Sequence, residues 1–400
     1  MKTTSLLLSI LFLSYVSLAQ SVGEQPAKYE NMADKLLATD GKLSIGGYAQ
    51  IDYNQPFSSD RRYNGVLDVH RLVMLFGYNF DARTQFITEI EYEHVNELYI
   101  EQAFLQYRIL PWLNFRGGLM LIPMGIMNEY HEPPTYNGVE RPMIDNVIAP
   151  TTWRELGFGF TGSFYQADLR YQLYVVNGFN GYDTRGIVTG RGLRSGRQKG
   201  IESYISAPNL SGKLEYYGIR GLNVGISGYF GDTQSKLYNN LDKSDPVALA
   251  RADSSVVGIS MIGADARYTR KGFQLRGQYY YTGLKNTAAY NQFTAVAGKP
   301  NDTGSAMTGY YLEAAYNLFQ PFASLKTELI PFVRYEEFNT HHKVDASMTA
   351  KDTYHTKVWI GGLGWKMVPG AVLKADLQFH KNMASDKFTK TFNAGIGIMF

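Results

Sequence analysis

The chain contains no cysteine, and this absence excludes disulfides, thiolate metal sites and cysteine nucleophiles. It also lacks a strong net charge: the formal value is +3 over 400 residues, which is not the charge of a nucleic-acid-binding protein. Phosphate-binding P-loops, Gly-x-Ser-x-Gly elbows and His-Glu-x-x-His metal motifs are missing as well. The seven histidines are scattered, and His341 and His342 with Asp345 are too poorly placed for a metal site. We therefore predict no enzyme, cofactor, metal or nucleic-acid partner.

Long apolar runs are also rare. The one substantial run covers residues 6–16, follows Lys2, and precedes the small residues Ser17 and Ala19. A transmembrane helix needs about 20 apolar residues, so this pattern predicts a signal peptide over 1–19, cleaved before Gln20. If the chain lies in a membrane, it must cross it with strands.

What the chain has in excess is aromatic residues and glycine, with 30 Tyr, 22 Phe and 40 Gly. Its last stretch alternates apolar and polar positions up to the terminal Phe400, through Phe392, Ile396 and Ile398. A period of two indicates a strand with one apolar face. An apolar strand that ends the chain leaves an exposed edge unless the sheet closes on itself. In a barrel, lipid covers the apolar face and closure removes the edge.

The same alternation recurs along the chain. We predict an all-β fold, a transmembrane antiparallel β-barrel of about 16 strands over residues 41–400. In the second strand, parity places His70 on the apolar face with Leu72, opposite Arg71. The predicted strands lie at 43–54, 68–80, 83–93, 99–110, 113–122, 154–164, 166–177, 209–217, 222–231, 256–270, 272–283, 306–318, 327–339, 355–367, 370–381 and 388–400.

Connections alternate between tight turns and longer loops, the latter including 94–98, 123–153 and 178–208. This asymmetry is typical of outer-membrane barrels, whose short turns face the periplasm and whose long loops face the exterior. Residues 20–40 are then a periplasmic lead-in, weakly helical around 29–38. The alternative is a soluble sandwich, whose loops would not alternate in this way.

Basic and acidic residues share the predicted inner face. An arginine column in a water-filled tube attracts anions, whereas pairing with Glu89, Glu91, Asp265, Glu313, Glu336 or Asp376 would only stiffen the wall. Both interpretations stay open. The basic pore-lining candidates for an anion path are Arg71, Arg108, Arg116, Arg170, Arg267, Arg276, Arg334 and Lys374.

Two loops carry further candidates. The proline-rich segment 123–153 is long enough to be functional; folded inward it would narrow a channel, and folded outward it would cap the mouth. The loop 185–199 is basic without an acid, and it could attract anions, bind lipopolysaccharide or simply be solvated. The constriction candidates are Glu129, His131, Glu132, Glu140, Arg141, Asp145 and Arg154. The basic-loop candidates are Arg185, Arg191, Arg194, Arg197 and Lys199.

Several blocks of sequence resemble the phosphate-selective porin O and P family, in a Bacteroidetes-type form. They are residues 101–108 (EQAFLQYR), 113–119 (LNFRGGL), 123–125 (PMG), 153–157 (WRELG) and 331–336 (PFVRYE), together with the closing strand. The resemblance covers about residues 41–400 and implies a sixteen-stranded homotrimeric porin. Known members bind phosphate with an arginine ladder and lysines on an inward loop. Here the loop 123–153 departs from that pattern, because it has no lysine and Arg141 is its only arginine.

These observations together predict an outer-membrane porin of a Gram-negative cell, passing small hydrophilic solutes by diffusion with a bias toward anions. The expected partners are membrane lipid, lipopolysaccharide and the barrel-assembly machinery, which would read the strand ending at Phe400. The alternatives are a plugged barrel whose long loops bind a ligand or partner, and an outer-membrane hydrolase, for which no convincing triad is visible.

Overall fold

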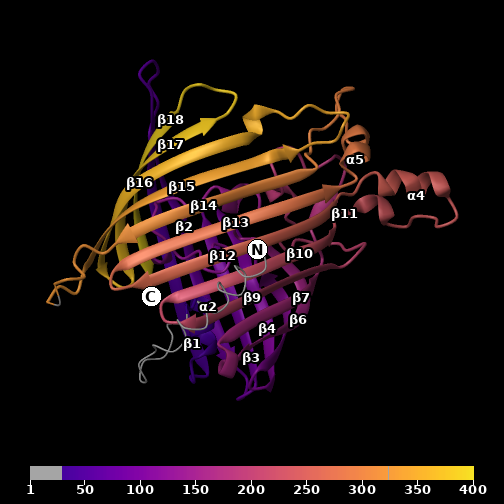
Figure 1. Ribbon diagram of the computed structural model, residues 1–400. Helices are drawn as coiled ribbons and strands as arrows, with labels where there is room; N and C mark the ends of the chain where they lie inside the picture. The colour runs from indigo at the N-terminus through magenta and orange to yellow at the C-terminus, as the bar shows by residue number, and fades with distance from the viewer. Residues whose placement is uncertain (1–28, 323) are drawn as a thin grey trace, which may run out of the picture.

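The computed structural model describes residues 29–322 and 324–400. The predicted signal peptide and the first part of the predicted lead-in lie outside these residues. Sixteen antiparallel strands form one closed ring in which each strand pairs with its neighbour in sequence (Figure 1). The ring strands are β1 (Leu43–Phe57), β2 (Val66–Asn79), β3 (Thr84–Glu93), β4 (Glu97–Leu110), β5 (Leu113–Leu121), β6 (Arg154–Phe164), β7 (Leu169–Val176), β9 (Asn209–Ile219), β10 (Leu222–Asp232), β12 (Gly258–Arg270), β13 (Phe273–Lys285), β14 (Ala306–Tyr316), β15 (Glu328–Lys343), β16 (His355–Val368), β17 (Ala371–Asn382) and β18 (Thr389–Met399).

Every predicted strand matches one strand of the ring, so the predicted fold class is confirmed. The ring closes between β1 and β18, where Phe400 and Gly47 exchange two backbone hydrogen bonds, the Phe400 amide to the Gly47 carbonyl at 2.9 Å and the reverse at 3.0 Å. On β18, Phe392, Ile396 and Ile398 are exposed whereas Asn393 is buried. The apolar side of the alternation therefore faces outward, as the sequence predicts.

Smaller elements lie in the connections. The described helices are α2 (Met32–Leu37), α3 (Ile144–Val147), α4 (Pro246–Asp253) and α5 (Thr287–Phe293), with 3₁₀ turns at Pro133–Thr135, Tyr165–Ala167, Arg194–Gly196, Lys236–Tyr238 and Asp352–Tyr354. β8 (Asn180–Tyr182) and β11 (Gln234–Ser235) form a separate two-stranded parallel sheet. The helix α4 projects beyond the ring (Figure 1). No helix among the described residues is long and apolar enough to cross a membrane.

Two predictions about the strands are wrong: the long loop at 94–98 and the outward orientation of His70. Residues 94–98 are not a long loop, because β3 and β4 meet in a tight turn in which His94 and Val95 have positive φ values of 52° and 61°. The pairing of β1 with β2 also shifts between Gln50 and Asp52, as a β-bulge does. The bulge turns His70 to the inner side, where its Nδ1 lies 4.0 Å from buried Asp52.

Candidate functional site

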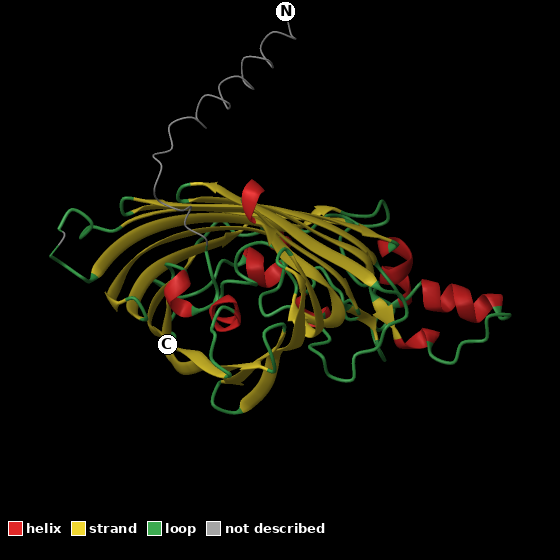
Figure 2. Cartoon of the chain, turned by 90° about the horizontal axis from the view of Figure 1, so that it is seen from below, coloured by secondary structure: helices red, strands yellow, loops and turns green. Residues whose placement is uncertain are grey.

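The inside of the ring is occupied by the segment 122–153, which we call the inward loop. Viewed along the ring, short helices and loop segments lie within the circle of strands (Figure 2). Its apolar side chains, among them Met124, Ile126 and Ile148, pack in one buried cluster with inward side chains of the wall such as Tyr48 and Tyr280. Of the two positions that the sequence left open, the structure therefore has the loop inside the barrel and not over its mouth.

The first limb of the loop is bound by Lys213 of β9. Its Nζ donates to the Gly125 carbonyl at 2.6 Å and to Glu129 Oε2 at 2.9 Å. The Ile126 amide donates to Gln278 Oε1 of β13 at 2.6 Å. Gly125 has φ +67°, and a Cβ there would lie 1.9 Å from the Tyr280 hydroxyl oxygen. Only glycine therefore fits this close approach of the loop backbone to the wall.

The second limb is bound by β15 and β17 on another side of the ring. Lys374 Nζ donates to the carbonyls of Tyr136 and Gly138, at 2.7 and 2.8 Å. Asp376 accepts from the Val139 amide at 2.7 Å, and Glu336 accepts from the Met143 amide at 2.6 Å. Charged wall residues thus bind loop backbone groups that would otherwise be buried without partners.

An aromatic cluster holds the end of the loop. Trp153 is fully buried and packs against Phe179 and Tyr229, with ring centroids 4.5 and 4.6 Å apart. Its indole Nε1 donates to Glu155 Oε1 at 2.8 Å. The loop is therefore fixed at its end as well as at both limbs.

His131 forms the electrostatic contact between the loop and β3 and β4. Its Nε2 lies 3.4 Å from both Glu89 Oε1 and Glu101 Oε2, and Nδ1 lies 3.0 Å from the Asn128 carbonyl. Burial lowers the pKa of His131, but hydrogen bonds and charge attraction from Glu101 and Glu89 outweigh burial and raise it to about 10. His131 is thus an imidazolium at neutral pH, and Arg154, 3.6 Å from Glu101, adds a second positive charge.

The other constriction candidates bind the wall, the helix α2 or the inward loop itself. Glu132 accepts from the Met32 amide at 2.7 Å, Glu140 from Asn54 at 3.0 Å, and Arg141 donates to the His131 carbonyl at 3.0 Å. Asp145 accepts from Gln278 and Tyr280, at 2.6 and 2.9 Å. Burial raises the pKa of Asp145 to about 7, although these hydrogen bonds lower it. The structure gathers these residues inside the ring, where they hold the loop.

Most of the predicted basic column is ion-paired. Arg71 pairs with Glu91, Arg170 with Asp34 and Glu215, Arg267 with Glu215, Arg276 with Glu313, and Arg334 with Glu313 and Glu336, at separations of 2.5 to 3.6 Å. Lys374 binds the loop carbonyls described above. Wall neutralisation, which was one of the two interpretations left open by the sequence, therefore accounts for most of the column.

Arg108 and Arg116 are different. Neither guanidinium has a carboxylate within ion-pairing distance among the described residues. Arg116 donates to Gln106 and Tyr174 and stacks 4.3 Å over the Phe104 ring, and Arg108 is exposed. Both line a cavity of about 470 Å³, together with Arg170 and Asp34 of α2. A separate, smaller cavity of about 40 Å³ is lined by Arg116 and Arg170 together with Glu129 of the inward loop.

The described part of the predicted lead-in takes part in this site. Met32, Ala33 and Leu36 of α2 are buried, and Asn31 caps the helix by accepting from the Asp34 amide. Asn31 also donates to the Glu129 carbonyl at 3.0 Å. The segment therefore packs inside the ring against the inward loop.

The predicted basic loop splits into two parts. Arg185 and Arg191 are exposed to solvent. Arg197 donates to the Thr151 carbonyl at 2.5 Å and Arg194 to the same carbonyl at 3.4 Å, while Lys199 lies 4.5 Å over the Tyr99 ring. Three of its five cations thus contact the inward loop or the wall.

Sequence reasoning missed Lys213, Gln278 and Tyr280, which bind the loop. Strand parity was the available signal: Lys213 is buried between Leu210 and Leu214, both exposed. A lone lysine at an inward position is compatible with any wet lumen, so parity alone could not single it out.

A closed sixteen-stranded ring with an inward loop defines the class: the chain has the fold of outer-membrane porins. Solved structures with this fold include OmpF of Salmonella typhi (TM-score 0.56, 13% identity, covering 90% of this chain and 97% of that one). An anion-selective porin from Comamonas acidovorans gives a TM-score of 0.55 at 12% identity, covering 90% and 99%. OmpT of Vibrio cholerae in a trimer form gives 0.50 at 11%, covering 90% and 99%.

An uncharacterized protein of Aquifex aeolicus is 30% identical over 382 residues, which span 92% of this chain and 82% of the relative. The chain therefore belongs to the same family as this Aquifex protein. No family model matches the chain.

Proposed function

We propose that the protein is an outer-membrane channel through which small hydrophilic solutes diffuse passively, with the inward loop as its constriction. The observation that carries this proposal is the position of that loop. It lies inside a closed ring, is bound to several strands, and through Glu129 lines a small polar cavity together with Arg116 and Arg170. A fixed loop of this kind limits the size of a solute without any moving part.

The finer proposal is a bias toward anions such as phosphate. Two observations support it: the guanidinium groups of Arg108 and Arg116 lack acidic partners among the described residues, and the resemblance to phosphate-selective porins runs through both. A similarly folded structure is that of an anion-selective porin. The inward loop offers no lysine, so the bias we propose rests on the wall arginines alone.

Planar-bilayer recording under a salt gradient tests both the channel and its bias toward anions. Wild-type protein should give discrete conductance steps and a reversal potential on the anion side. R108Q/R116Q should move that potential toward zero, because it removes two wall cations that have no carboxylate partner among the described residues. The matched control R61Q/R62Q removes two exposed arginines from the 58–65 loop and should leave the potential unchanged. Cation preference in wild type would remove the anion proposal but not the channel.

A plugged barrel whose long loops bind a partner is the second candidate. It is favoured by the dense binding of the inward loop, since Lys213, Lys374, Asp376 and Glu336 all hold its backbone or side chains. Absence of conductance steps from protein that migrates as folded would decide for this alternative.

We also make proposals on the export of the protein, its location, its partners and its oligomeric state. We propose export by the leader 1–19, residence in the outer membrane of a Gram-negative cell, and contact with lipid, lipopolysaccharide and the barrel-assembly machinery through the strand ending at Phe400. A homotrimer is proposed as well; a similarly folded protein, OmpT of Vibrio cholerae, has been solved in a trimer form. Cross-linking in native membranes would test the trimer.

A further inference from the structure

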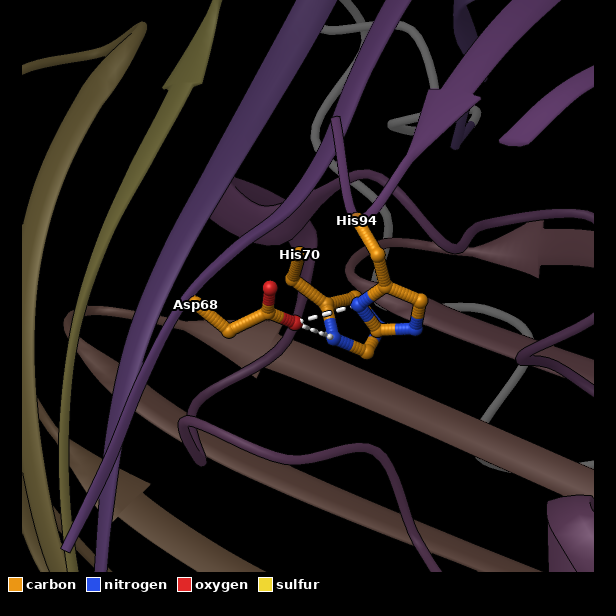
Figure 3. Close-up of side chains that lie close together, drawn as sticks. All are labelled: Asp68, His70 and His94. Atoms are coloured by element: carbon orange, nitrogen blue, oxygen red, sulfur yellow. Dashed lines mark hydrogen bonds and ion pairs between the residues drawn. The ribbon is translucent and has the colours of Figure 1, made fainter. Parts of the chain in front are cut away.

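Three side chains of types that can bind a metal lie together at the long-loop end of the barrel, and Asp52 lies beside one of them. Asp68 and His70 come from β2, His94 from the tight turn after β3, and Asp52 from β1 (Figure 3 shows the first three). Asp68 Oδ2 lies 2.5 Å from His94 Nδ1 and 3.6 Å from His70 Nδ1. Asp52 Oδ2 lies 4.0 Å from the same His70 nitrogen.

Two features of the backbone bring the imidazoles together. The bulge in β2 turns His70 inward beside Arg71. The His94 amide donates to the His70 carbonyl at 3.2 Å, and the left-handed conformation of His94 and Val95 turns the His94 ring back over the strand. The two rings meet edge to face with centroids 5.3 Å apart. A left-handed valine is an unfavourable conformation, so the rest of the structure must hold this turn in place.

The donor set fits a divalent first-row transition metal. One donor atom from each of Asp68, His70 and His94 lies within 4.8 Å of the other two. Donors around a tetrahedral zinc ion with bonds of about 2.0–2.1 Å are separated by about 3.3 Å, and the observed 2.5 and 3.6 Å lie on either side of that value. Imidazole with carboxylate suits zinc and its neighbours, whereas calcium and magnesium prefer oxygen ligands alone.

The site is open to solvent. The side chain of His94 is 48% exposed, and those of His70 and Asp68 are each 25% exposed. The second such group, Glu89, Glu101 and His131, is fully buried, and Arg154 and the His131 imidazolium already neutralise its carboxylates. Only the first group can therefore take an ion from the medium without loss of the loop contacts.

We propose that Asp68, His70 and His94 form a zinc-type metal site at the outer mouth of the barrel, with Asp52 as the fourth ligand or as the group that orients His70. A bound ion would join β1, β2 and the β3–β4 turn. The proposal departs from the sequence prediction of no metal, which rested on the scatter of the seven histidines along the chain. It does not depend on whether the barrel conducts.

Zinc binding to the full refolded barrel in detergent tests the site. Competition with a zinc-responsive chelator should give one ion per chain. H70N, H94N and D68N should each weaken binding at least tenfold, and H342N, which replaces an exposed histidine on β15, should leave it unchanged. Heat-modifiable electrophoretic mobility confirms that each variant is folded.

A measurement on the wild type covers the case in which a variant fails to fold. X-ray absorption of the zinc-loaded protein should show imidazole scattering from two histidines. Absence of stoichiometric binding, scattering from oxygen alone, or equal affinity in wild type, H70N and H94N would each overturn the proposal.

Discussion

Replacing Lys213 with methionine should remove the hydrogen bonds that hold the first limb of the inward loop against β9. The change keeps the length of the side chain but removes its charge. It leaves the Gly125 carbonyl without its donor at 2.6 Å and Glu129 without its partner at 2.9 Å. Glu215 keeps Arg170 and Arg267. Asp265, 3.7 Å from Lys213, has no hydrogen bond to either oxygen among the described residues, so it loses its nearest cation.

The magnitude follows from the burial of these groups. Removing one partner of a buried ion pair costs about 3–5 kcal/mol because the other charge is left uncompensated. We expect K213M to lower the free energy of unfolding by that amount. K236M is the matched control, since Lys236 pairs with Asp183 at 2.8 Å but is 54% exposed. An exposed pair contributes about 0–1 kcal/mol.

Urea unfolding of the refolded barrel, followed by tryptophan fluorescence and electrophoretic mobility, measures the difference. The double variant K213M/E129Q should recover part of the loss, because it also removes one of the orphaned charges. A loss in K213M no larger than that in K236M would refute the reasoning, since it would mean that the loop is not held by this lysine.

Three further predictions concern the same loop. The free energy of unfolding should fall as pH rises from about 6.5 to 10. The pKa of His131 is higher in the folded than in the unfolded protein, so its protonation stabilises the fold fully below the ordinary histidine pKa, and this contribution is lost as pH rises through 10. In urea unfolding at a series of pH values, H131Q should lack that part of the pH dependence. G125A should lose about 2 kcal/mol or more in urea unfolding, because alanine disfavours a left-handed φ and its Cβ would meet Tyr280; a neutral effect would contradict the close approach. K374M should lose roughly 2–4 kcal/mol in the same assay, since two buried carbonyls lose their donor; unchanged stability would show that the second limb is held otherwise.

The barrel itself could be predicted because lipid and lumen impose a period of two on each strand. Residues such as Phe392, Ile396 and Ile398 carry that signal locally. The bulge at His70 breaks the period by one residue, and nothing in the local pattern distinguishes it from a regular strand. The prediction for His70 was therefore wrong while its neighbours were placed correctly.

The candidate site was only partly predictable. Its charges were visible in the sequence, but most of the paired cations have a partner far along the chain, as with Arg170 and Asp34 or Lys374 and the Tyr136 carbonyl. A charge count cannot tell an unpaired arginine from a neutralised one. The contrast between Arg108 or Arg116 and the paired residues exists only in the folded structure.

A double-cysteine variant tests most directly whether the inward loop lies inside the barrel and reaches β18. The chain has no cysteine of its own. A Cβ placed at Gly395 on β18 would lie 3.0 Å from Val139 Cγ1 of the loop, which is compatible with the Cβ–Cβ separation of about 3.5–4.5 Å in disulfides. V139C/G395C should form a disulfide under mild oxidation, seen as a mobility change that a reductant reverses, whereas V247C/G395C, with its first cysteine in α4, should not. Folded V139C/G395C protein that stays uncrosslinked would contradict the inward position of the loop.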